Sequence, residues 1–428
     1  MNSKLREVTF ERMKKILALL ILSWTATSCM SPLVENQFLV ENMMKRHPDK
    51  FRHILDQKDK LEIQIIYTQI NRDSLNRPVF RSFYYNVDST KYFYPASTVK
   101  LPMVLLALEK INQLNIKGLD KFTSMFHDSV YSGHISVKKD STAESGLPSI
   151  AHYAKKILLV SDNDASNRLY EFMGQKAAND ILKSKGYNIR LLHRLERPLK
   201  PDQNRHTEPV RFLRNDTLIY QQPMLVHEDS IKPPRRVFRG IGYIKQDTVL
   251  VNEPFEFTYK NSYPLEEQQE ILKAVLFPGA IDPKKRFNLT ESDRRYVMQY
   301  MSQLPRETKF PAYYKDSSYY DSYCKFLVFG ETKEPIPANI RIFNKVGDAY
   351  GYLIDNAYFV DFEHGVEFML SAVINTNIDQ IYNDSKYEYS SLGFPFMRDL
   401  GQTVYGYELK RKRKHQPDLS AFQFKYDQ

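Results

Sequence analysis

The stretch Ser97-Thr-Val-Lys-Leu-Pro-Met-Val-Leu-Leu-Ala-Leu-Glu-Lys-Ile111 decides how this 428-residue chain folds. Its apolar residues recur with helical spacing, so a helix is predicted to start near Ser97. Pro102 falls in the first turn, where a missing backbone donor costs nothing. Residues three apart on a helix share a face, so the amine of Lys100 is expected within hydrogen-bond reach of the Ser97 hydroxyl. The positive end of the helix dipole also favours negative charge that develops at Ser97.

Two further short motifs complete a pattern typical of nucleophilic catalysis. Ser161-Asp162-Asn163 lies between two predicted helices, and Lys345-Val346-Gly347 opens a predicted strand. A serine hydroxyl is a poor nucleophile without a neighbouring base. Lys100 can be that base if burial, or the nearby cation of Lys345, lowers its pKa. Ser161 would then relay a proton to the leaving group, and Asn163 would hold the substrate or Lys100. Alone, each motif is equally typical of a helix cap, a turn or a surface lysine; their combination indicates a serine hydrolase.

The remaining pattern predicts an α+β fold whose sheet joins the two ends of the chain. Alternating or apolar runs predict strands at 61–70, 81–85, 340–344, 350–362 and 366–375. Helical spacing predicts helices at 150–160, 165–173, 175–185, 290–304 and 386–400. Between about residues 205 and 285, a proline pair and short alternations indicate an inserted β-rich or irregular segment.

Together the three motifs resemble those of the penicillin-recognising serine enzymes, the class A β-lactamases and penicillin-binding proteins. Gly146-Leu-Pro148, the helix at 167–174 and Arg194-Leu-Glu-Arg197, which resembles the start of the family's Ω-loop, extend the resemblance. It implies a β-lactamase/transpeptidase-like domain over about residues 35–410. In that fold an all-helical subdomain, here about 97–205, packs on an antiparallel sheet flanked by helices. The segment at about 205–285 would be an insertion.

The resemblance also implies roles around a cleft between the two parts. The backbone N–H groups of Ser97 and Asp348 would form an oxyanion hole. Asn163 and Gly347 would lie beside the substrate. Tyr131 would line the cleft mouth, or be an ordinary half-exposed aromatic. Glu196 is the candidate for the glutamate that activates the deacylating water; the alternative is a salt bridge with Arg194 or Arg197.

Two residues depart from the family pattern. The third motif normally has Thr or Ser in its middle, whose hydroxyl helps to bind the substrate carboxylate, and Val346 cannot donate a hydrogen bond. Asp348 also brings a carboxylate to an oxyanion position. Both changes argue against β-lactam hydrolysis, so we expect a small-molecule or peptidoglycan-like amide or ester as substrate. The competing hypothesis is a catalytically idle lipoprotein that uses the fold for binding, which the intact catalytic set disfavours.

The N-terminus has the order of a bacterial lipoprotein signal peptide, predicted to span residues 1–29. Lys14 and Lys15 precede a short apolar core at 16–22, and Ala26-Thr-Ser-Cys29 resembles a lipobox whose cysteine is acylated. The apolar core is too short to span a bilayer. We therefore expect an exported, membrane-anchored lipoprotein that faces the periplasm or the cell surface; the alternative is a secreted protein with a free cysteine. Cys324 is then alone, so no structural disulfide is expected.

The formal net charge is +10, but the basic residues do not form one stripe interleaved with aromatics. No nucleic-acid partner is therefore expected. Residues 411–428 are interpreted as a basic polar tail, able to touch anionic lipid headgroups. The ten histidines show no metal-ligand spacing, and the chain has no nucleotide loop or cysteine cluster, so neither a metal nor a cofactor is expected.

Overall fold

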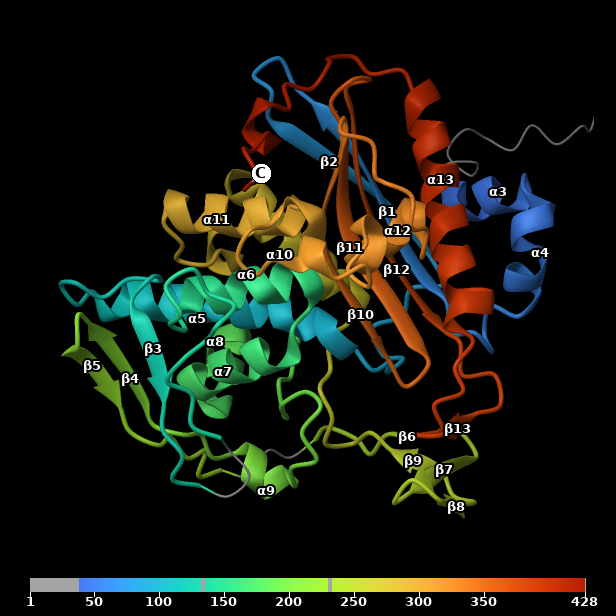
Figure 1. Cartoon of the computed structure of the whole chain (residues 1–428). Coiled ribbons are helices and arrows are strands. Elements are labelled where there is room, and N and C mark those ends of the chain that lie inside the picture. Colours follow the sequence, from blue (N-terminus) through green and yellow to red (C-terminus); the bar gives the residue numbers. More distant parts are fainter. Residues whose placement is uncertain (1–37, 132–134, 230–232, 428) are drawn as a thin grey trace, which may run out of the picture.

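A five-stranded antiparallel sheet forms the centre of the molecule (Figure 1). The computed structural model describes residues 38–131, 135–229 and 233–427. The strand order is β10-β11-β12-β1-β2, so two N-terminal strands pair with three C-terminal ones, and every pairing is antiparallel. The α+β expectation is therefore confirmed. The strands are β1 (Gln64–Arg72), β2 (Pro78–Tyr85), β10 (Ile340–Ala349), β11 (Tyr352–Asp361) and β12 (Val366–Asn375).

Helices cover both faces of this sheet. Strands β11 and β12 are buried along their whole length, which is the pattern of central strands covered on both sides. One face packs against α3 (Leu39–Lys45), α4 (Pro48–Asp56) and α13 (Phe394–Lys410), and the other against α10 (Leu265–Leu276) and α11 (Glu291–Ser302) (Figure 1).

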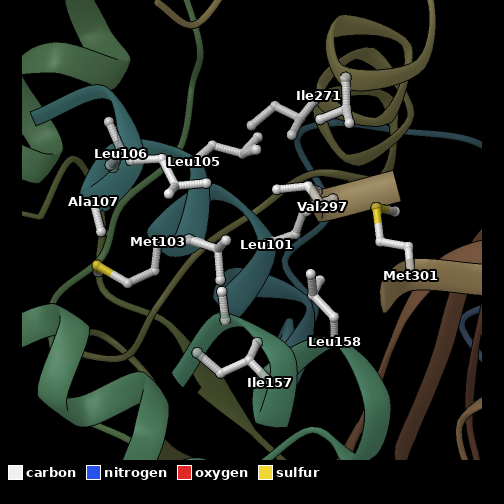
Figure 2. Packing of buried hydrophobic residues seen from close by; sticks show 14 of the residues in the cluster. Leu101, Met103, Leu105, Leu106, Ala107, Ile157, Leu158, Ile271, Val297 and Met301 are labelled. Carbon is white, nitrogen blue, oxygen red and sulfur yellow. The ribbon is translucent and has the colours of Figure 1, made fainter. Parts of the chain in front are cut away.

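The helical subdomain is built around α5 (Lys100–Leu114), which follows a 3₁₀ turn at Ala96–Val99. Its side chains are buried on all sides through Glu109, so it forms the axis of the subdomain core. In Figure 2 its residues Leu101 and Leu105 pack among Ile157, Leu158, Ile271 and Val297. The same hydrophobic core thus joins the subdomain to α10 and α11 behind the sheet. The other helices are α6 (Ile150–Val160), α7 (Asn163–Met173), α8 (Gln175–Ser184) and the short α9 (Pro201–Asn204).

This subdomain is not all-helical, in contrast to the expectation. It carries a second, three-stranded sheet of order β3-β4-β5, formed by β3 (Ser124–His127), β4 (Val210–Arg214) and β5 (Thr217–Gln222). Strand β4 buries Val210 and Phe212 in the subdomain core, and Phe212 packs on Phe172 with ring centroids 5.2 Å apart. The start of the expected insertion therefore belongs to the subdomain.

The remainder of the expected insertion divides into two parts. Residues 265–276 form α10, a core helix that packs on β11 and β12, so the insertion ends earlier than expected. Residues 233–262 form a small lobe that touches the 380–382 segment (Figure 1). Its short strands agree with the β-rich prediction for this segment. They are β6 (Phe238–Arg239), β7 (Gly242–Lys245), β8 (Val249–Val251) and β9 (Phe255–Glu256), and β7 also pairs with β13 (Ile381–Tyr382).

The C-terminal segment is docked, which corrects its interpretation as a solvated basic tail. Phe422 is buried, and its ring lies 4.8 Å from that of Tyr358 on the central sheet. Arg411 and Arg413 form ion pairs with the fully buried carboxylate of Glu408, at 2.8 and 2.5 Å. A buried carboxylate needs such partners, so these two arginines are structural.

Two further boundaries differ from the predictions. Strand β10 continues through Ala349, because its pairing with β11 runs to Ala349 opposite Tyr352. Lys345-Val346-Gly347 therefore lies inside a strand instead of opening one. The last α-helix begins at Phe394 and not at 386, and a π-helical turn at Tyr389–Gly393 leads directly into it. A short helix, α12 (Phe326–Phe329), packs on this last helix.

No helix in the described residues is long and apolar enough to cross a membrane. The predicted signal peptide, 1–29, and Cys29 lie outside the described residues.

Candidate active site

A cleft of about 1040 Å³ lies where the helical subdomain meets the edge of the central sheet. Ser97, Ser161, Asn163, Glu196 and Asp348 all line it, although they come from four separate segments of the chain. Lys100 and Lys345 are buried and are not among the residues that line the cleft. The fold thus gathers the residues of all three motifs at one place.

Ser97 is the one partly exposed residue in a buried stretch, Tyr92 to Lys100, so its side chain reaches the cleft. The residue before it, Ala96, has a φ of +46°, a left-handed conformation that is uncommon for a residue with a side chain. Such backbone strain is concentrated at functional sites. Ser97 is also the second residue of its helical turn, where the backbone N–H has no helical acceptor and can serve a ligand.

Lys100 is fully buried and its amine is surrounded by oxygen acceptors. It donates to the Asn163 Oδ1 at 2.5 Å, to the Ser161 Oγ at 3.2 Å, and to the carbonyl oxygen of Ser161. Burial lowers the pKa of Lys100 well below its usual value, and the positive charge of Lys345 lowers it further. The alternative role for Asn163 suggested by the sequence, holding Lys100, is the one seen here.

Ser161 connects the two lysines. Its Oγ accepts from the Lys345 Nζ at 2.8 Å as well as from Lys100, and Lys345 also donates to the carbonyl oxygen of Val346 at 2.8 Å. A hydroxyl has two acceptor positions and one proton. With both acceptor positions used by lysines, the proton of Ser161 is left to donate elsewhere. Ser161 adopts a φ of +62° at the end of α6, which aims both of its oxygens at Lys100.

Gly347 brings β10 against the turn that carries Ser97. A Cβ at this position would lie 2.8 Å from the carbonyl oxygen of Pro95, 2.9 Å from the Ser97 nitrogen and 3.0 Å from the Thr98 nitrogen. Only glycine permits this approach. The next residue, Asp348, lines the cleft. The backbone segments expected to form the oxyanion hole are therefore neighbours.

Two of the three carboxylates that line the cleft, Asp348 and Glu196, interact electrostatically; the third is Glu256. Partial removal from water raises the pKa of Asp348, Lys345 and Lys100 oppose that rise, and Glu196 adds to it. Glu196 is exposed to the cleft with a φ of +50°. The alternative of a salt bridge does not hold, because Arg194 pairs with Glu171 at 2.7 Å and Arg197 with Asp164 at 3.2 Å.

Of the two alternatives for Tyr131, the structure shows the half-exposed aromatic and not a residue that lines the cleft. Its ring stacks on His206 with centroids 4.3 Å apart, and its backbone N–H donates to the buried carboxylate of Glu208. Tyr131 is not among the residues that line the cleft. Other aromatic residues line it instead, and sequence reasoning missed them because they share no spacing: Tyr94, Tyr320, Tyr323, Tyr350, Phe255 and Tyr387.

Cys324 also lines the cleft, and it is a free thiol. Burial raises its pKa, so the thiol is held in its neutral form. Within the described residues, no group of three or more His, Cys, Asp or Glu side chains is placed to hold a metal ion.

Comparison with known proteins agrees with the motifs. Residues 49–227 match the beta-lactamase enzyme family, a span that includes Ser97, Lys100, Ser161, Asn163 and Glu196 but ends before Lys345. No curated protein sequence matches the chain.

Solved structures of similar fold are β-lactamases and a penicillin-binding protein. A β-lactamase from Sphaerobacter thermophilus is 12% identical with a TM-score of 0.45, over 87% of this chain and 98% of that one. A β-lactamase from Xanthomonas campestris is 13% identical with a TM-score of 0.45, over 85% and 97%. An acyl-enzyme complex of PBP-A with penicillin G is 14% identical with a TM-score of 0.45, over 89% and 98%.

Proposed function

This chain resembles the class A β-lactamases and penicillin-binding proteins, and from that premise we propose that it is a serine hydrolase acting on an amide or ester through an acyl-enzyme. The observation that carries the proposal is the pair of buried lysines, Lys100 and Lys345, joined through the hydroxyl of Ser161 beside Ser97. Placing two amines in the interior costs stability, which their hydrogen bonds offset only in part. Buried groups with shifted pKa values are concentrated at catalytic sites.

In the proposed acylation step, neutral Lys100 removes the hydroxyl proton of Ser97 as the oxygen attacks the substrate carbonyl carbon. The carbonyl oxygen becomes an oxyanion, which the N–H groups of Ser97 and Asp348 stabilise. Ser161 donates its proton to the leaving group as the bond to carbon breaks, and it recovers a proton from Lys100. Lys345 stays charged and keeps the pKa of Lys100 low.

Deacylation needs a base for water, and Glu196 is the proposed group. It faces the same cleft as Ser97 and forms no ion pair with a described residue, so its carboxylate is available. Asp348, whose charge interacts with that of Glu196, is a second carboxylate of the cleft. If Asp348 activated the water instead, Glu196→Gln would leave turnover intact.

The proposed substrate carries no carboxylate next to the scissile bond. Val346 is buried in the hydrophobic core and offers no hydroxyl. An unmade hydrogen bond to a charged group costs about 1.5–3 kcal/mol, which weakens binding roughly ten- to hundredfold. Asp348 adds repulsion toward an anion at that position. Small neutral esters and amides, or peptidoglycan-like groups without a free carboxylate there, fit better than β-lactams.

Steady-state kinetics on a chromogenic cephalosporin and on a neutral para-nitrophenyl ester test this function. We expect turnover of the ester, lost in Ser97→Ala, and little or no turnover of the cephalosporin. Glu196→Gln should leave a burst of one product equivalent followed by slow release. Rapid cephalosporin turnover would contradict the proposed substrate class, and equal ester turnover by Ser97→Ala would contradict the proposed chemistry.

We further propose that the mature protein is a lipoprotein anchored through Cys29, outside the cytoplasm. The signal-like order of residues 1–29 supports this. Fractionation of cells that carry Cys29→Ser tests it. The variant should move to the soluble fraction, and a variant that stays wholly with the membrane would refute the anchor.

A further inference from the structure

One wall of the cleft includes two tyrosines, Tyr94 and Tyr350, that lie close in sequence to the two residues of the proposed oxyanion hole, Ser97 and Asp348. Tyr94 precedes Ser97 by three residues, and Tyr350 follows Asp348 by two. Their rings meet edge to face with centroids 5.0 Å apart. Both residues line the cleft. Whatever binds at this wall is therefore close in the chain to both halves of the proposed oxyanion hole.

Lys260, from the 233–262 lobe, places its ammonium group on this wall. The Nζ atom donates to the Tyr350 hydroxyl at 3.0 Å. It lies 4.9 Å from the ring centroid of Tyr350, 5.4 Å from that of Phe255 and 6.0 Å from that of Tyr94. Aromatic faces stabilise a cation at these distances. Lys260 itself lines the cleft.

The position of Lys260 is fixed by its neighbour in sequence. Asn261 is buried, and its Oδ1 accepts the backbone N–H groups of Leu192 and His193, at 2.7 and 3.1 Å. The Tyr92 hydroxyl donates to the Asn261 carbonyl oxygen at 3.0 Å. These bonds attach the lobe to the segment that leads to Glu196. Lys260 is thus held on the wall and is not a free surface lysine.

Lys260 has no carboxylate partner among the described residues. Glu256, an acidic residue of the lobe that also lines the cleft, pairs with Arg236 at 3.4 Å. Removal from water lowers the pKa of half-buried His193 to about 4, and the charge of Lys260 contributes to this, so that ring stays neutral and adds no competing positive charge. A partly buried cation without a counter-ion, facing a ligand cleft, is suited to binding an anion.

We propose that Lys260 is a specificity residue that binds an anionic group of the substrate, remote from the scissile carbonyl. The inference rests on the proposed serine hydrolase function and narrows its substrate class. Val346 and Asp348 disfavour an anionic group next to the reacting carbonyl. Lys260 favours an anionic group at Tyr350, farther along the substrate. The substrate is therefore an ester or amide that carries its negative charge several bonds from the reacting carbon.

Matched para-nitrophenyl esters test this inference: the suberate half-ester, its neutral methyl ester, and an ω-phosphonate of the same length. The suberate and phosphonate arms distinguish a carboxylate from a phosphate-like ligand. In the parent protein, kcat/KM should be about tenfold higher for at least one anionic ester than for the neutral one. Lys260→Met should bring that ratio close to one, and Lys260→Arg should keep most of it. Lys245→Met, in the same lobe but exposed on β7, is the matched control and should keep the full ratio.

An equal ratio in Lys260→Met and the parent would overturn the inference, as would a parent with no preference for either anionic ester. Failure of the proposed function has a different signature, because no ester would then be turned over by any variant. In that case, calorimetric binding of suberate to Ser97→Ala still tests the anion site. Binding that is lost in Ser97→Ala/Lys260→Met supports it, and no binding to Ser97→Ala overturns it.

Discussion

Replacing Gly347 by alanine tests the close approach that builds the proposed oxyanion hole. The added Cβ would lie 2.8–3.0 Å from three atoms in residues 95–98. All three are backbone atoms, so no side chain can rotate away, and β10 must separate from the Ser97 turn by about half an ångström. Overpacking of this kind costs about 1–3 kcal/mol of folding stability. Because misplacement by 1 Å costs about a hundredfold in rate, we expect acylation to slow by roughly ten- to hundredfold.

The assay is the second-order rate of labelling by a fluorophosphonate, measured together with the thermal melt. Gly406→Ala is the matched control, because a Cβ there meets no atom within 4 Å and the residue lies inside α13. It should label at the parental rate and gain up to about 1 kcal/mol from helix propensity. A Gly347→Ala protein that labels as fast as the parent would show that the close contact of β10 with the Ser97 turn does not position the nucleophile.

Two further predictions concern the buried lysines and the docked C-terminus. Labelling of Ser97 should accelerate as pH rises through the depressed pKa of Lys100, because only the neutral amine is a base. Lys345→Met removes a positive charge and so raises the pKa of Lys100, which should move the acceleration to higher pH. A move to lower pH would contradict the role of Lys100 as the base. Truncation after Lys410 removes the buried Phe422 and leaves the carboxylate of Glu408 without Arg411 and Arg413. The free energy of unfolding, measured with denaturant, should therefore fall by at least about 3 kcal/mol. An unchanged unfolding midpoint would show that residues 411–428 are a solvated tail.

The sequence predicted the fold where local pattern and tertiary environment agree. The helix over residues 150–160 and the strand over 366–375 have the predicted bounds. In both segments a long run of residues with the right propensity and hydrophobic spacing determines the local structure. The helix predicted to start near Ser97 is also present, although a 3₁₀ turn at Ala96–Val99 precedes the α-helix proper, which begins at Lys100. Prediction failed where burial overrides composition. Residues 411–414 carry four basic side chains, yet Arg411 and Arg413 neutralise one buried carboxylate that lies a turn earlier.

The residues of the candidate site that belong to short motifs could be predicted from the sequence. Ser97, Ser161, Asn163 and Asp348 line one cleft and Lys100 donates to Ser161 and Asn163, whereas Tyr131 does not line the cleft. Lys260 could not be found from the sequence, because nothing in its neighbourhood distinguishes it from other lysines. Its role depends on a lobe that returns to the cleft through Asn261, and such a long-range contact leaves no local spacing.

The central claim is that Ser97 is the nucleophile, and peptide mass mapping after exposure to a fluorophosphonate tests it most directly. We expect one adduct per chain, on the peptide that contains Ser97. Ser97→Ala should carry none, and Ser161→Ala should carry the same adduct more slowly, because it loses a proton relay and keeps the nucleophile. Labelling of Ser97→Ala equal to that of the parent, or an adduct on another residue, would contradict the account.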